Sequence, residues 1–177
     1  MGLEELKYPI GRFIQPDNIN KMHIDQWIEE IEKLPGQLRE AVSQLTDEQL
    51  NTPYRPEGWT ARQVIHHLPD SHMNAYIRFH LSLTEENPVI KPYFEDRWAE
   101  LNYAKTVPVE FSLNLLLSLH QRWVYLLKSL TEEQLKKTFI HPEHNKEFNL
   151  EKVLGTYAWH GKHHLAHITE LKKRNNW

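Results

Sequence analysis

The chain has 177 residues and a formal net charge of −3, with 21 basic residues interspersed among 24 acidic ones. This length suits a single domain, residues 1–177, and the mixed charge excludes the basic stripe of a nucleic-acid-binding protein. The chain has no cysteine, which excludes disulfides and a thiol nucleophile of its own, and no apolar run is long enough to span a membrane. Because the N-terminus lacks a signal-peptide pattern, we expect a cytoplasmic protein.

Apolar residues recur at helical spacing in four long stretches, which proline-rich connections separate. The four expected helices are residues 20–44, 60–83, 108–130 and 149–173. Within the first, Pro35 and Gly36 are expected to bend or break the helix. Residues 84–108 contain three prolines and predict an irregular crossover with one short helix. Since no stretch alternates with a period of two, the sequence predicts an all-α chain.

One short pattern occurs twice. Residues 45–50, LTDEQL, recur as residues 130–135, LTEEQL, and each copy follows a long expected helix and precedes a helix that carries histidines. In each copy the threonine and the glutamine three residues later form a capping box, which predicts a short helix. The repeated order predicts a bundle with an approximate internal two-fold, in which the two histidine-bearing helices face each other.

Four histidines lie within eight residues of the last expected helix, at positions 160, 163, 164 and 167. His160 and His164 are four residues apart, so their rings emerge from one face of a helix and can bind one divalent cation. His164 falls on the buried seam of the helix and His160 beside it, whereas His163 falls in a more exposed sector. The spacing leaves a pairing of His164 with His167 open.

The helix that opens at Thr60 offers a third ligand. Beside its apolar seam runs a polar stripe, which is typical of a helix that lines an internal pocket. His67 lies on this stripe and is the predicted third ligand. His66 is expected to face solvent, and His72 to be a hydrogen-bonded core residue. The stripe consists of Thr60, Val64, His67, Ser71, Asn74 and Arg78.

His120, on the third long helix, is expected to lie in the core or beside the ligands. It could also be a fourth ligand, as could Glu170, and a filled coordination shell would indicate a structural metal clamp rather than an enzyme. Nitrogen ligands without cysteine suit zinc or nickel, and three protein ligands would leave open positions for catalysis. The sequence therefore predicts one divalent ion per chain.

Several segments together resemble the DinB/YfiT-like superfamily, and the likeness covers essentially the whole chain. Residues 58–72 resemble its first metal-ligand motif, residues 160–167 its second, and residues 8–13 the N-terminal signature of the YfiT branch. The resemblance implies a four-helix bundle with a three-histidine metal site at His67, His160 and His164, frequently in a homodimer.

The resemblance also implies an enzyme with a small-molecule substrate. Members of the superfamily have been described as metal-dependent hydrolases, and relatives transfer low-molecular-weight thiols such as bacillithiol or mycothiol to electrophiles. A metal site of this kind can activate water for hydrolysis or hold a cosubstrate thiol as its reactive thiolate. We expect thiol transfer, with hydrolysis as the alternative. A non-enzymatic metal-binding protein is the third possibility.

Overall fold

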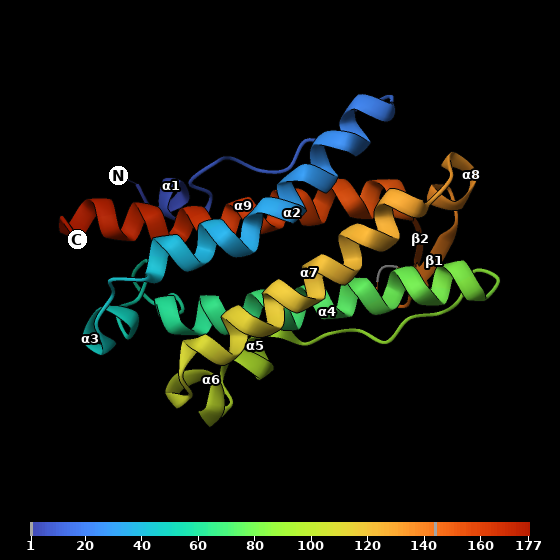
Figure 1. The fold of residues 1–177 in the computed structure, drawn as a ribbon. Coiled ribbons are helices and arrows are strands. Elements are labelled where there is room, and N and C mark those ends of the chain that lie inside the picture. The colour runs from blue at the N-terminus through green and yellow to red at the C-terminus, as the bar shows by residue number, and fades with distance from the viewer. Residues whose placement is uncertain (1, 144) are drawn as a thin grey trace.

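The computed structural model describes residues 2–143 and 145–177, and within them four long helices form a bundle (Figure 1). These helices are α2 (Lys21–Val42), α4 (Ala61–Thr84), α7 (Val109–Ser129) and α9 (Leu150–Asn175). The shorter helices are α1 (Leu3–Lys7), α3 (Asp47–Leu50), α5 (Glu95–Ala99), α6 (Asn102–Thr106) and α8 (Glu132–Leu135). The predicted four-helix fold is confirmed, with boundaries within a few residues of those expected.

Local capping interactions explain where the helices begin. The Thr60 hydroxyl accepts from the Gln63 amide at 3.2 Å, and the Gln63 side chain accepts from the Thr60 amide at 3.0 Å. The two copies of the short repeat, α3 and α8, begin with the same reciprocal pair of bonds. Such bonds satisfy amide groups that have no partner in the first turn of a helix.

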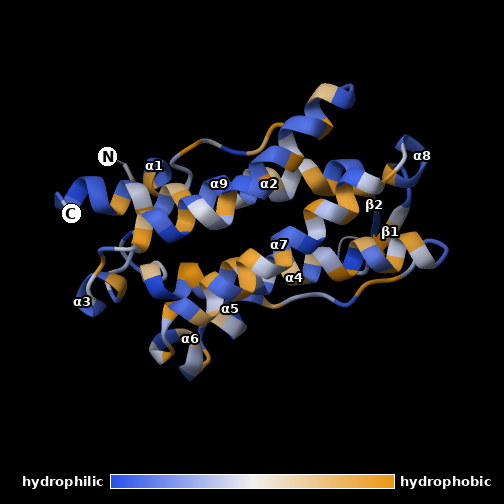
Figure 2. Cartoon of the chain, viewed as in Figure 1, coloured by the Kyte–Doolittle hydropathy of each residue, from blue (hydrophilic) through white to orange (hydrophobic). Residues whose placement is uncertain are grey.

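Each long helix packs against two others. Helix α2 contacts α7 and α9, and α4 contacts the same two, so the histidine-bearing helices α4 and α9 lie beside each other (Figure 1). The order long helix, short helix, long helix occurs twice along the chain, as the sequence repeat predicts. Apolar positions run along the four helices with hydrophilic positions between them (Figure 2), and side chains such as Trp123, Phe79 and Leu154 form the core.

Helix α2 does not break at Pro35 but continues as one helix to Val42. A proline inside a helix has no N–H, so the carbonyl four residues earlier loses its usual donor. Here that carbonyl belongs to Ile31, and the Nδ1 atom of His120 on α7 lies 2.6 Å from it. A side chain from another helix therefore takes the place of the missing backbone donor.

Two features lie outside the purely helical prediction. The crossover contains two short helices, α5 and α6, rather than one. Strands β1 (Thr138–His141) and β2 (Lys146–Asn149) form an antiparallel hairpin, in which Phe139 pairs with Phe148. Strands of four residues are too short to produce a clear alternating pattern, which explains why the sequence does not reveal them.

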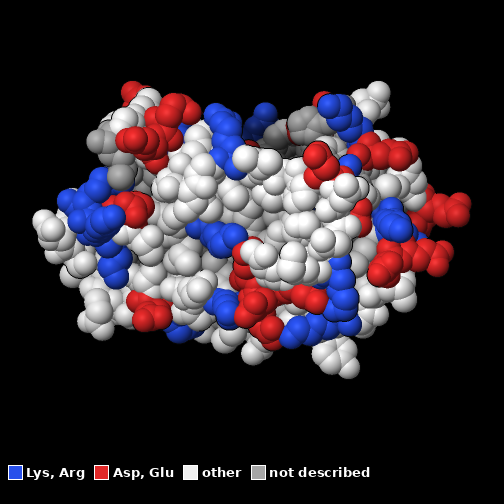
Figure 3. Space-filling model, turned by 90° about the horizontal axis from the view of Figure 1, so that it is seen from above, with Lys and Arg blue, Asp and Glu red and all other residues white. Residues whose placement is uncertain are grey.

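On the face shown in Figure 3, basic and acidic side chains are intermixed among uncharged ones, and neither sign covers a large continuous area. Among the helices of the described residues, none is both long and apolar enough to cross a membrane.

Gly155 allows α9 to approach α2 closely. A Cβ atom at this position would lie 2.8 Å from Cζ2 of the buried Trp27 and 3.0 Å from the Phe13 ring. We expect Gly155→Ala to lower the free energy of unfolding, because overpacking costs about 1–3 kcal/mol while the gain in helix propensity is about 1 kcal/mol. Gly36→Ala is the matched control, since an added Cβ there meets no atom of the described residues within 4 Å. Urea unfolding should show a loss for Gly155→Ala and no loss for Gly36→Ala.

Candidate metal centre

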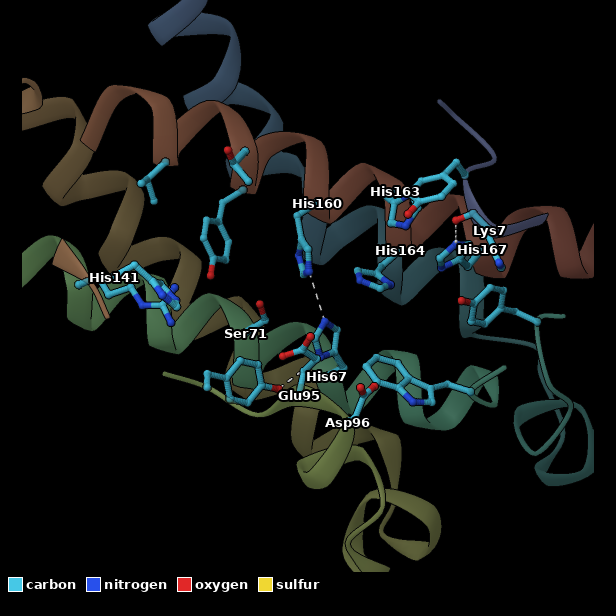
Figure 4. A pocket seen from close by; sticks show the side chains of 18 of the residues that line it. Lys7, His67, Ser71, Glu95, Asp96, His141, His160, His163, His164 and His167 are labelled. Carbon is cyan, nitrogen blue, oxygen red and sulfur yellow. Dashed lines mark hydrogen bonds between the residues drawn. The ribbon is translucent and has the colours of Figure 1, made fainter. Parts of the chain in front are cut away.

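The structure brings His67 of α4 together with His160 and His164 of α9. One nitrogen from each of the three rings lies within 4.8 Å of the other two, and the Nε2 atoms of His67 and His160 are 3.2 Å apart. Figure 4 shows His160 and His164 extending from α9 toward His67 on the facing helix. The four-residue spacing on α9 therefore places two rings on one face, as the sequence predicts, and the bundle supplies the third.

Burial keeps these three histidines neutral. Withdrawal from water and, to a smaller extent, the nearby His167 lower the pKa of His67 to about 3. The pKa values of His160 and His164 also lie well below the ordinary value, first because of burial and then because of the neighbouring histidines. A neutral imidazole carries the free lone pair that a metal ion requires.

The nitrogen atoms fit a borderline cation. The Nδ1 atom of His164 is buried and has no hydrogen-bond partner among residues 2–143 and 145–177. The Nδ1 atoms of His163 and His167 are likewise buried without a hydrogen-bond partner in this part of the chain, so the fit to a metal ion rests on the three converging ring nitrogens. An all-nitrogen donor set of this kind suits zinc or nickel.

The structure distinguishes the alternatives that the spacing left open. His167 does not join His164, because its Nε2 atom lies 3.0 Å from the Lys7 carbonyl and its ring stacks on Tyr54 at 3.9 Å between centroids. Within the part of the chain that the structure describes, no fourth histidine, aspartate or glutamate joins the three candidate ligands. Glu170 instead pairs with Lys173, and both ring nitrogens of His120 are engaged elsewhere.

Two histidines are more buried than their helical sectors predict. His66 is only 1% exposed, because Ser112 bonds its Nδ1 atom at 2.7 Å and the Val107 carbonyl lies 3.3 Å from its Nε2 atom. His163 is 7% exposed and lies between the rings of Trp159 and Tyr8. Ser112, Val107 and Tyr8 come from segments distant in sequence, which helical periodicity does not reveal. Trp159 lies one turn before His163 on the same helix.

A cavity of about 1020 Å³ opens beside the three histidines. Its wall includes His67, Ser71 and Arg78 of the polar stripe on α4, so the predicted pocket-lining face is present. Asn74 of the same stripe instead donates to the Asp70 carbonyl at 2.8 Å. The other wall segments are the N-terminal Lys7 and Tyr8, the loop before α4, the crossover, the hairpin and α9.

The sequence did not identify Tyr93, Glu95 and Asp96, which the crossover contributes to the cavity wall. Figure 4 shows the two carboxylates, Glu95 and Asp96, beside His67. The Tyr93 hydroxyl lies 3.3 Å from Nδ1 of His67, and burial raises the pKa of this tyrosine above its ordinary value, as do nearby acidic groups. The only sequence signal was the concentration of aromatic residues between prolines in this segment.

The fold and the site define a helical-bundle protein with a candidate three-histidine metal centre. The family model described as the DinB superfamily matches residues 30–168, and the chain belongs to this superfamily.

Relatives are similar over the full length of the chain. Proteins of Bacillus cereus (strain 03BB102) and Bacillus thuringiensis subsp. konkukian (strain 97-27) are 57% identical over 175 residues, which cover 99% of this chain and 100% of each relative. Both carry the name "Putative metal-dependent hydrolase", which supports enzyme status for this chain.

Two solved structures share the fold. YfiT from Bacillus subtilis, described as a probable metal-dependent hydrolase with an unusual four-helix bundle topology, matches with a TM-score of 0.95 and 53% identity over 98% of this chain and 99% of that one. A mycothiol-dependent maleylpyruvate isomerase matches with a TM-score of 0.60 and 15% identity, over 82% of this chain and 63% of that one. The second likeness shows the common fold alone.

Proposed function

We propose that the protein is a metal-dependent enzyme in which His67, His160 and His164 hold one divalent ion, zinc or nickel. The observation that carries this proposal is the convergence of three neutral imidazoles, two buried and one partly buried, on one cavity. Because no fourth protein ligand joins them among the described residues, open coordination positions would face the cavity. Open positions are typical of catalytic rather than structural metal sites.

The ion would supply Lewis acidity, which favours the deprotonated form of a thiol or of water. The residues of the chain would position the reacting group and limit the access of water. His67, His160 and His164 fix the position of the reacting group at the end of the cavity. Trp59 and Tyr93, whose rings contact His67, limit the access of water to one side of the centre.

The reaction that we propose is the transfer of a low-molecular-weight thiol to a small electrophile. In this transfer the thiol releases its proton to solvent, its sulfur forms a bond to the electrophilic carbon, and the leaving group departs with the electrons of the broken bond. The chain has no cysteine, so the thiol must come from a cosubstrate. The cavity, at about 1020 Å³, has room for two small reactants, and the mycothiol-dependent isomerase performs thiol-related chemistry on the same fold.

Hydrolysis is the second candidate. The relatives at 57% identity are named as metal-dependent hydrolases, and Glu95 and Asp96 add carboxylates to the cavity wall. A carboxylate at this position could accept a proton from an attacking water molecule.

The mass of the product distinguishes the two reactions. Metal-reconstituted protein would be incubated with an aryl chloride and, separately, with an aryl ester, each with and without bacillithiol. Thiol transfer predicts turnover of the chloride only when the thiol is present, and a product that contains the thiol. Hydrolysis predicts turnover of the ester at a rate that omission of the thiol does not change, and a product that lacks it. Retention of metal without turnover of either probe would favour a structural metal site.

A further inference from the structure

Three histidines form a chain of hydrogen bonds that leads from the centre of the bundle to the candidate metal site. The Nε2 atom of His120 lies 2.9 Å from Nδ1 of His72, and Nε2 of His72 lies 3.2 Å from Nδ1 of His160. The far end of the chain is the Ile31 carbonyl, 2.6 Å from Nδ1 of His120. Of these three histidines, the proposed function uses only His160 and gives His72 and His120 no role.

The Ile31 carbonyl, at the end of this series of hydrogen bonds, fixes the direction of every bond in it. A carbonyl oxygen only accepts, so Nδ1 of His120 must donate, and Nε2 of this neutral ring must then accept. His72 therefore donates from Nδ1 and accepts at Nε2, where His160 donates from its own Nδ1. This assignment leaves the lone pair of His160 on Nε2, the atom that lies 3.2 Å from Nε2 of His67.

Pro35 makes this arrangement possible. Because proline has no N–H, the Ile31 carbonyl lacks its donor within α2 and remains available to His120. His120 and His72 are 1% and 0% exposed, so bulk water does not replace either bond. The rings of Trp123 and Tyr157 contact His72 edge-on and restrict its orientation.

We propose that His72 and His120 are positioning residues that hold His160 in the tautomer whose Nε2 lone pair faces the cavity. We call the hydrogen-bonded series from the Ile31 carbonyl through His120 and His72 to His160 the relay, and the carbonyl freed by Pro35 is its fixed end. The role in metal binding rests on the proposed function, whereas the tautomers are properties of the metal-free chain. Ordered partners of this kind orient a ligand histidine and increase its basicity. Because the relay ends at a carbonyl, which takes up no proton, it orients His160 and does not conduct protons.

Because the relay fixes the tautomer of His160, only His67 would need to change its tautomer when a metal ion binds. In the metal-free protein, Nε2 of His160 is an acceptor, so His67 donates to it from Nε2 and accepts at Nδ1 from the Tyr93 hydroxyl. If His67 and His160 held a metal ion, both Nε2 atoms would need their lone pairs. The proton of His67 would then reside on Nδ1, which would donate a hydrogen bond to the Tyr93 oxygen, while His160 would keep its tautomer.

The tautomers can be measured directly by long-range ¹H–¹⁵N correlation NMR on protein with ¹⁵N-labelled histidine. In the metal-free protein we expect protonated Nδ1 on His120, His72 and His160 and protonated Nε2 on His67. Addition of Zn²⁺ should change the tautomer of His67 alone among these four. A metal-free His160 protonated on Nε2 would overturn the relay. The expected tautomers in a protein that binds no Zn²⁺ would support the relay and refute the metal centre.

Zinc affinity tests whether the relay matters for binding. We expect His72→Phe to weaken Zn²⁺ binding by about 10–100-fold, the usual effect of losing a partner of a ligand histidine. His120→Phe should weaken binding in the same direction. His120→Gln, whose amide can still accept from His72, should restore both the affinity and the His160 tautomer.

The control is His66→Phe, which removes a buried histidine with hydrogen bonds of its own outside the relay. It should lower thermal stability without changing the His160 tautomer or the Zn²⁺ affinity. If both His120→Phe and His72→Phe bind Zn²⁺ as tightly as the unmodified protein, the positioning role is wrong. Should His72→Phe fail to fold, the pair of His120 variants and the tautomers of the unmodified protein decide the question.

Discussion

Replacing His164 by alanine is expected to remove the metal ion, of which the unmodified protein should retain about one per chain after purification. Three ligands are the minimum for a stable site of this type, so loss of one leaves two nitrogen donors and an uncovered ion. His67→Ala and His160→Ala should have the same effect. Elemental analysis of each purified variant measures it.

The controls are His163→Ala and His66→Ala, which remove buried histidines near the ligands. Both should lower the thermal stability and still retain about one ion per chain, because the rings of His163 and His66 have other partners. Full metal content in His164→Ala would contradict the ligand assignment. Loss of metal from the two controls as well would mean that the assay reports folding rather than ligation.

Acid is expected to destabilise the metal-free protein strongly between pH 6.5 and 4. Burial lowers the pKa of His120 from 6.5 to about 4, although its bond with the Ile31 carbonyl opposes the shift. A lowered pKa means that the unfolded chain binds the proton first as pH falls, so stability is fully present above pH 6.5 and is lost toward pH 4. At about 1.4 kcal/mol per pKa unit, His120 alone accounts for a loss of about 3 kcal/mol.

That loss is a large part of the 5–15 kcal/mol that stabilises a typical domain, and the other buried histidines with lowered pKa values act in the same direction. Urea unfolding of the metal-free protein at pH 7, 6 and 5 measures the slope. In His120→Gln the slope between pH 6 and 5 should fall by about 1.4 kcal/mol per pH unit, the effect of one proton. The charged groups that line a small cavity beside His120 are Glu32 and Lys128. They form an ion pair with each other at 2.8 Å rather than with His120. An unchanged slope would show that His120 is not the titrating group.

Features that depend on neighbours in sequence were predicted well. The capping pairs at Thr60 and Thr131 predict helix starts because the bonds join residues three apart. The spacing of His160 and His164 predicts a shared face for the same reason. His67 required one further step, the recognition of a polar stripe beside an apolar seam, and the structure places it opposite the other two.

Several contacts between distant segments were not predicted. The burial of His163 results from Tyr8, more than 150 positions earlier, and the contact of Tyr93 with His67 results from the path of the crossover. The effect of Pro35 on helix α2 could not be predicted from the neighbouring sequence either. Its effect on α2 depends on whether a donor from another helix meets the Ile31 carbonyl, and His120 of α7 does so.

The wall of the cavity and the candidate ligands come from different parts of the fold. His67, His160 and His164 stand on two long helices that are fixed by the core, whereas much of the surrounding wall belongs to the N-terminus, the crossover and the hairpin. Surface connections of this kind accept substitutions and insertions far more readily than packed helices do. Selection can therefore alter which molecules enter the cavity while the chemistry at its end stays the same, so divergence between relatives should concentrate in those three segments.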